Sequence, residues 1–560
     1  MQAELSRSMA RLRLKGYEAP YFIGYAVRDY QQRAVGGRFG APVDQNISHA
    51  RQAWVEVRVG DYQFDNTSSD REMAFDLGDT DGWDPPTEAP LDDDPQALRG
   101  TLWLLTDAKY KHALGAYAKK RGRRATTISE DESLPSFSRE PAAHHVDPTT
   151  PFVWDEPSLG ARATRASALF KQYPDLFDGS VKISGDRVTR WFVNSEGTAV
   201  VTERTIYAVH LSAATRAKDG MLLEHEKDFY GRALEELPDD KLLADTIAQL
   251  ATELRALREA PTVDPYTGPA ILMEEAAGVF FHETVGHRLE GERQNDEKEG
   301  RTFKGQVGKH VLPDFLSVVD DPTVRSAGGK EAPSEGGGPA VAHRPVSLNG
   351  WYSVDDEGVA ARKVTLIDNG ILRDYLKSRT PITGSMRSNG HGRAEGTADP
   401  MGRMANLFLR STKRVPVGKL KQMLLDEVRR QGKPFGLIIR DITGGSTNTS
   451  NFGYQAFKGQ PRLVYRVDAK TGAETLVRGV EMVGTPLTTV SRIVATSDTE
   501  GVFNGFCGAE SGFVPVSTVA PAVLMSEIEL QRTQKAAERP PLLPPPWLDN
   551  GRPPTTTRRR

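Results

Sequence analysis

The feature that most constrains this chain is a short apolar segment carrying two histidines and a glutamate, His282, Glu283 and His287. It lies within residues 274–292, which read EEAAGVFFHETVGHRLEGE. The two glutamates at its start suit a helix N-terminus, and the alanines, valine and phenylalanines that follow suit a buried helix. The sequence therefore predicts a buried helix that presents two imidazoles and one carboxylate.

The spacing of the two histidines does not fit a regular helix. Five residues on an α-helix leave side chains about 140° apart around the axis, whereas the four-residue spacing of the common zinc-protease helix keeps them on one face. A π-type turn would bring His282 and His287 together, and Gly286 would ease that distortion. We therefore expect a widened or broken helix whose imidazoles hold a metal ion, with Glu283 taking a proton from its bound water.

Cys507 is the only cysteine in the chain and lies in the sequence GVFNGFCGAESGFVPV, which we expect to be a loop. A single cysteine forms no intrachain disulfide and is often just a small buried apolar residue. A thiolate is also a suitable third ligand for a catalytic metal, which commonly has three protein ligands. The main alternative is a nucleophile activated by a histidine, which would leave the role of His282 and His287 unexplained.

Several further motifs, in a fixed order along the chain, carry a resemblance to a known family. They read HETVGHRLEGE, FKGQVGKHV, SVVDDPT, YSVDDEG, SNGHGRAEG, PMGRMANLF, FCG and GFVPV. Together they closely resemble the TldD/PmbA family of metalloproteases, strongly over residues 266–523 and weakly before them. The resemblance implies that His282 and His287 bind the metal, that Cys507 completes the ligand set, and that Glu283 is the catalytic base. Because the family's non-catalytic partner subunit lacks the histidine motif, this chain resembles the active type.

The resemblance also implies a cofactor, substrates and partners. The metal would be divalent, zinc in the first place and iron(II) as the alternative, and the substrates would be unfolded or extended peptides. The chain would form a dimer with a closed chamber, either with a second copy or with a PmbA-like subunit. His391 and Arg393, in the glycine-flanked sequence SNGHGR, are candidate substrate-binding residues. For His391 the alternative is a loop histidine that bonds to the backbone.

Two other functions remain open. One is a metal amidase or deformylase-like hydrolase, because two histidines and a cysteine also suit small amide substrates. Cleavage of formylated or small amides, without cleavage of extended oligopeptides, would identify it. The other is a non-catalytic peptide-binding subunit with a structural metal, in which Glu283→Gln would leave the function intact.

The pattern of helices and strands predicts an α+β fold with an N-terminal mixed α/β domain and a mostly antiparallel β C-terminal domain that carries the metal-binding helix. We expect the first domain to span residues 1–265, with a loop insertion at about 68–150, because the sequence APTVDPYTGP suggests a boundary near Pro265. The second would span 266–530, with a hairpin at Asn369–Gly370 and a glycine-rich segment, 325–343, that is either a flap over substrate or an inert insertion. Residues 531–560 would form a disordered, proline-rich tail.

Composition excludes some functions. A net charge of −3 argues against a broad nucleic-acid-binding surface, and no apolar run approaches the ~18 residues that span a bilayer. The sequence starts with an amphipathic helix rather than a signal peptide, so we expect a cytoplasmic protein, although a mature form trimmed of an export signal would look the same.

Overall fold

The structure, a computed structural model, describes residues 1–67, 85–126, 134–296, 299, 301–328, 345–449 and 457–533, with isolated residues up to 548. Residues 68–84 and 127–133 of the predicted loop insertion, and most of the glycine-rich segment predicted as a flap or an insertion, lie outside the described residues.

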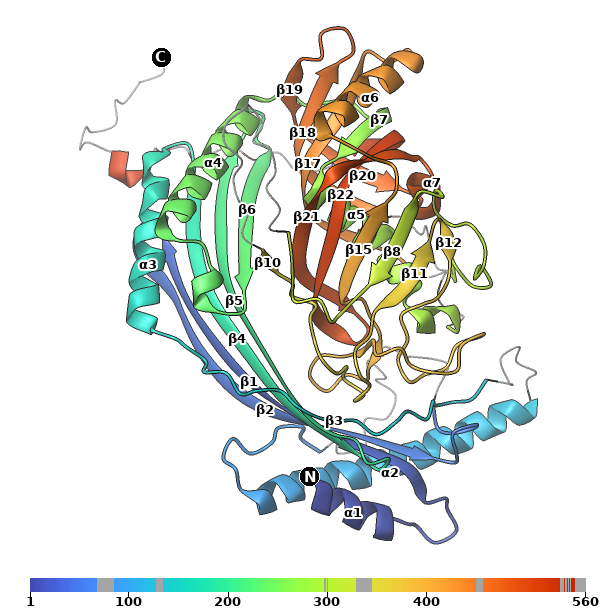
Figure 1. The fold of residues 1–560 in the computed structure, drawn as a ribbon. Coiled ribbons are helices and arrows are strands. Elements are labelled where there is room, and N and C mark those ends of the chain that lie inside the picture. The colour runs from blue at the N-terminus through green and yellow to red at the C-terminus, as the bar shows by residue number, and fades with distance from the viewer. Residues whose placement is uncertain are drawn as a thin grey trace, which may run out of the picture.

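The N-terminal half is built on a long, curved sheet of six strands in the order β2-β1-β4-β5, with β3 and β6 both pairing with β5 (Figure 1). All pairs are antiparallel except β3 with β5. The strands are β1 (Pro20–Arg38), β2 (Ala41–Val59), β3 (His144–Val146), β4 (Asp178–Asn194), β5 (Ala199–Arg216) and β6 (Leu222–Gly231).

Four helices pack at the two ends of this sheet. They are α1 (Gln2–Arg11), α2 (Pro95–Thr126), α3 (Glu156–Ala168) and α4 (Asp240–Glu259). The first two share a core with β1 and β2, whereas the other two share a core with β4, β5 and β6. The face of α4 shows why it forms: Leu243, Ile247 and Leu254 recur at helical spacing and are buried, and the Asp239 carboxylate caps the first turn.

The C-terminal half is a second sheet of twelve strands in which antiparallel pairs predominate. Its main strands are β7 (Tyr266–Leu272), β8 (Leu316–Asp320), β11 (Val364–Asp368), β15 (Asn406–Ser411), β17 (Phe435–Thr447), β18 (Phe457–Asp468), β20 (Val480–Gly484), β21 (Ile493–Ala509) and β22 (Gly512–Arg532). The order β22-β20-β18-β17-β7 returns to β22, so these strands close into a ring. The helix α5 (Glu274–Thr284) follows β7 directly and packs against β17, β21 and β22.

The predicted α+β class and the predominance of antiparallel strands are confirmed. The predicted hairpin is also confirmed, since Asn369 and Gly370 join β11 to β12 (Ile371–Leu372) with φ values of 47° and 77°. No helix within the described ranges is long and apolar enough to cross a bilayer.

Three local predictions were wrong. Cys507 lies on β21, paired with Val514 of β22, and not on a loop, because this hairpin continues to Ala509 before it turns. Within the predicted loop insertion at about 68–150, residues His144–Val146 form the short strand β3. The tail predicted to be disordered from residue 531 begins within β22, which runs to Arg532, and Glu538 farther on forms an ion pair with Arg216.

Candidate metal centre

The helix that carries the first histidine breaks before the second. The α-helix α5 ends at Thr284, and residues Gly286–Leu289 form a separate turn of 3₁₀-helix. The predicted break is thus confirmed, in the form of a tighter turn rather than a widened π turn. As a result the rings of His282 and His287 lie with centroids 5.1 Å apart and planes nearly perpendicular.

Cys507 joins the two histidines from a strand more than 200 residues away. One ligand atom from each of His282, His287 and Cys507 lies within 4.8 Å of the other two, and all three residues are buried. The Cys507 Sγ is 3.4 Å from Nε2 of His287. Two imidazoles and a thiolate are the donors that zinc prefers. The Nδ1 atom of His282 is also buried without a hydrogen-bond partner among the described residues, so the donor set fits a bound ion.

A buried carboxylate orients the second histidine. Nδ1 of His287 lies 3.2 Å from Glu290, so that its N–H donates to the carboxylate and its Nε2 faces Cys507. Such a carboxylate–histidine pair fixes the tautomer of a metal-binding imidazole. Burial acts to raise the pKa of Glu290, but the charges of His287, Arg293 and Arg403 lower it below its usual value.

The surroundings of Cys507 favour its thiolate form. Burial acts to raise the pKa of the Cys507 thiol, but the imidazoles of His287 and His282 lower it well below its usual value. For His287 burial acts in the other direction and lowers the pKa. The negative charges of Cys507 and Glu290 outweigh burial and raise the pKa of His287 to about 10. Negative groups that draw protons into a buried site also draw a divalent cation, which displaces those protons.

Arg403 fixes the position of Cys507. Its guanidinium donates to the Cys507 carbonyl at 2.6 Å and to Sγ at 3.2 Å, and it lies 3.2 Å from Glu290. Arg403 and Glu290 are both fully buried. Sequence reasoning missed their roles, although both lie within motifs that carry the family resemblance, HRLEGE and PMGRMANLF. The charged residues within these motifs were the available signal, but nothing in the sequence showed which partners they meet.

Glu283 lies beside the three candidate ligands. Its carboxylate is 4.0 Å from Nε2 of His287, and its side chain is almost fully buried against Gly445 of β17. The main-chain carbonyl of Glu283 accepts a hydrogen bond of 2.9 Å from Arg288, whose guanidinium also reaches Thr447 of β17. The carboxylate is thus placed between the histidine pair and one strand.

The structure does not bring His391 and Arg393 to this cluster. Both ring nitrogens of His391 are occupied, by the Asn389 carbonyl at 3.1 Å and by Asp320 at 3.2 Å, and the ring is fully buried. The interpretation of His391 as a loop histidine bonded within the protein therefore describes it better than substrate contact does. The guanidinium of Arg393 donates to the carbonyls of Met404 and Pro515.

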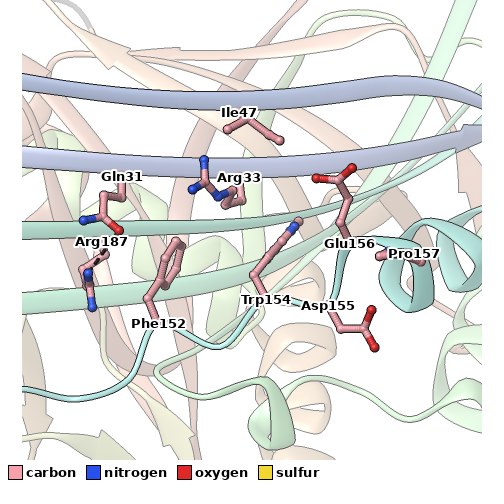
Figure 2. A pocket seen from close by; sticks show the side chains of 9 residues that line it. All are labelled: Gln31, Arg33, Ile47, Phe152, Trp154, Asp155, Glu156, Pro157 and Arg187. Carbon is pink, nitrogen blue, oxygen red and sulfur yellow. Dashed lines mark hydrogen bonds between the residues drawn. The ribbon is translucent and has the colours of Figure 1, made fainter.

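The broad hollow on the N-terminal sheet is unrelated to these residues. It measures about 700 Å³ and is lined by Gln31, Arg33, Phe152, Trp154 and Arg187, among others (Figure 2). None of the candidate site residues borders it.

Gly286 is expected to be essential for the break in the helix. A Cβ atom at this position would lie 2.0 Å from Sδ of Met404, so Gly286→Ala should force the 3₁₀ turn and Met404 apart. We expect the free energy of unfolding to fall by about 1–3 kcal/mol. Chemical denaturation would measure this, with Gly115→Ala in α2 as the control. A Cβ there meets nothing within 4 Å, so the control should be neutral or stabilising by up to about 1 kcal/mol. Equal stability of the two variants would contradict the prediction.

Comparison with known proteins places this site in a family. The profile of the PmbA/TldA metallopeptidase C-terminal domain matches residues 265–532. Metalloprotease MJ0996 of Methanocaldococcus jannaschii is 29% identical over 358 residues, which cover 62% of this chain and 69% of that protein. The metalloprotease TldD homolog of Haemophilus influenzae is 26% identical over 270 residues, 47% of this chain and 48% of its own length. The zinc metalloprotease TldD homolog of Saccharolobus solfataricus is 23% identical over 374 residues, 65% of this chain and 74% of its own length.

Solved structures share the fold at low sequence identity. The protein TM0727 of Thermotoga maritima superposes with a TM-score of 0.61 at 14% identity, over 94% of this chain and 99% of that one. TldE of Thermococcus kodakarensis superposes with a TM-score of 0.56 at 14% identity, over 91% and 97%. The C-terminal half, with the motifs that converge on the histidine and cysteine cluster, thus matches the C-terminal domain of the PmbA/TldD metallopeptidases, which confirms the predicted resemblance.

Proposed function

We propose that the chain is a metal-dependent peptidase in which His282, His287 and Cys507 hold a divalent ion. The observation that carries this proposal is the convergence of three buried donor atoms within 4.8 Å, with a glutamate 4.0 Å from one of them. The donor set favours zinc, with iron(II) as the alternative. Glu283 is the general base, and the chain is the active type of subunit in its family.

The roles of the residues follow from their positions. A divalent ion held there would polarise the substrate carbonyl and make a nearby water molecule more acidic. Glu283 takes a proton from the attacking water and later passes it to the leaving amine. Because Glu290 occupies Nδ1 of His287, this residue would hold an ion through Nε2, and Arg403 keeps the Cys507 sulfur in place.

An open strand edge beside Glu283 favours extended peptides as substrates. Strand β17 pairs with β18 as far as Thr447, but on its other side β7 pairs only with Leu437–Ile439. Among the described residues no strand covers that second edge from residue 441 onward, which is where Gly445 contacts Glu283. A peptide that adds a strand to this edge would be held by its main chain, which gives broad selectivity.

Gly445 is expected to set the position of the Glu283 carboxylate. A Cβ at residue 445 would lie 2.5 Å from Cγ of Glu283, so Gly445→Ala should displace the base. Because small displacements of catalytic groups are costly, we expect kcat to fall about ten- to a hundredfold with the metal retained. Gly444→Ala is the matched control, since a Cβ there meets nothing within 4 Å. Similar kcat values for both variants would contradict this placement of Glu283.

Metal removal tests the proposal against the amidase alternative. After its metal has been removed with a chelator, the protein should no longer cleave unfolded oligopeptides. It should regain this activity with one equivalent of Zn²⁺ per chain. Formylated and small amides, offered in parallel, should be poorer substrates than oligopeptides. Cleavage of the small amides alone would identify an amidase, and oligopeptide cleavage that survives complete metal removal would overturn the proposal.

We also propose, from the family resemblance, that the working form is a dimer, either with a second copy or with a PmbA-like subunit. Light scattering of the purified chain, alone and mixed with such a subunit, would distinguish the two forms.

A further inference from the structure

A partly open cavity lies between the two halves of the molecule. It measures about 360 Å³, in the size range of small-ligand sites, and β1, β4 and β5 of the N-terminal sheet form one wall. The segment 351–356, Arg393 and the β21–β22 hairpin form the other. Phe506 of this hairpin lines the cavity, whereas its neighbour Cys507 faces the histidines. Since successive strand side chains point to opposite faces, the cavity and the metal centre lie on opposite sides of one hairpin.

Most charges in the cavity are paired within the protein. Arg28 and Arg190 share the carboxylate of Asp356, which also accepts a hydrogen bond from the main chain of Ala394. Arg393 donates to two main-chain carbonyls and lies over the ring of Tyr352. These groups hold the two halves together.

Arg204 on β5 is the exception. It lines the same cavity and is partly exposed, and its side chain makes no hydrogen bond or ion pair with any residue that the structure describes, although its main chain pairs with Val188. Asp356 and Asp186 attract it from a greater distance, while burial, together with the charge of Arg393, lowers its pKa. Its neighbours across the sheet, Val188 on β4 and Tyr30 on β1, line the cavity as well, so its side chain faces the C-terminal half.

We propose that this cavity is a carboxylate-binding subsite in which the guanidinium of Arg204 receives a carboxylate of a peptide. An arginine that is largely removed from solvent is normally paired, and the planar fork of its guanidinium matches a carboxylate in two hydrogen bonds. The side chains of Phe506 and Phe513 supply half-exposed apolar surface for the body of a peptide. Six acidic residues also line the cavity, which favours a singly charged carboxylate over a phosphate. The choice of a peptide as the ligand rests on the proposed function.

The test is binding of short peptides to the full-length protein carrying Glu283→Gln, which prevents turnover. The free acid of N-acetyl-trialanine is expected to bind at least about tenfold more tightly than its amide in isothermal titration calorimetry. N-acetyl-Glu-Ala-Ala amide carries its only carboxylate on a side chain, so it distinguishes a side-chain carboxylate from a C-terminal one. If it binds as tightly as the free acid of N-acetyl-trialanine, the subsite accepts acidic side chains as well as the C-terminus. The preference for the free acid should disappear in Arg204→Gln, which loses no side-chain hydrogen bond or ion pair and should fold. It should be partly retained in Arg204→Lys.

Arg33→Gln is the matched control. Arg33 also lies on the N-terminal sheet and has a buried guanidinium nitrogen without a partner among the described residues, but it lines the separate hollow of Figure 2. This variant should keep the full preference. Equal binding of N-acetyl-trialanine and its amide, or a preference for the acid that survives in Arg204→Gln, would overturn the subsite. If the preference depends on Arg204 although the wild type cleaves no peptide, the subsite stands and the proposed peptidase function fails.

Discussion

Peptide cleavage by the Glu283→Gln variant should fall by about 10²- to 10⁴-fold, while its metal content stays at the wild-type value. The reason is that a glutamine keeps the size and burial of Glu283 but cannot take a proton, and general-base catalysis contributes a factor of this order. Because Glu283 is 4.0 Å from His287 and not one of the three clustered donors, the ion should remain bound. Single-turnover cleavage of an unfolded peptide, with metal analysis of the same sample, measures both quantities.

A glutamate from the same helix provides the control. Glu275 lies in the first turn of α5, is exposed, and pairs with Lys227 on the surface, so Glu275→Gln should retain wild-type cleavage. If Glu283→Gln were as active as Glu275→Gln, Glu283 would not be the base. The interpretation of a non-catalytic subunit with a structural metal would then be favoured.

Replacement of Cys507 by alanine should weaken metal binding by at least about a hundredfold. Loss of a residue that only orients a ligand costs ten- to a hundredfold in affinity, so loss of a ligand should cost at least as much. The thiol is buried and lies 3.4 Å from His287, and no other sulfur or carboxylate belongs to the group of donors found among the described residues. Competition with a chromophoric chelator would measure the affinity.

Val514→Ala separates the loss of a ligand from the loss of packing. Val514 is paired with Cys507 across the hairpin and is equally buried, so its truncation leaves a small cavity at the same place without removing a donor. This variant should lose stability and keep its metal affinity. Equal affinities in both variants and the wild type would mean that Cys507 is only a small apolar core residue.

The regular elements could be predicted from the sequence because each carries a local pattern. The helix α4 has leucines at helical spacing. The pair Asn369–Gly370 is strongly preferred in two-residue hairpin turns. The break after α5 followed from geometry alone, since a spacing of five residues cannot bring two imidazoles together on a regular helix. The kind of break did not follow, because the 3₁₀ turn depends on how closely Met404 approaches Gly286.

The surroundings of the site could not be predicted in the same way. The sequence identified His282, His287 and Cys507 by residue type and family motif, but Glu290 and Arg403 act through contacts between residues that are far apart in the chain. His391 illustrates the opposite error. A glycine-flanked histidine resembles a substrate-binding residue until its two hydrogen-bond partners, Asp320 and the Asn389 carbonyl, are known.

X-ray absorption spectroscopy at the zinc edge of the zinc-loaded protein would show whether Cys507 and the two histidines bind the ion together. We expect one sulfur at about 2.3 Å and two imidazole nitrogens at about 2.0 Å, with the sulfur contribution missing in Cys507→Ala. A wild-type spectrum without sulfur, or one that Cys507→Ala leaves unchanged, would contradict this expectation.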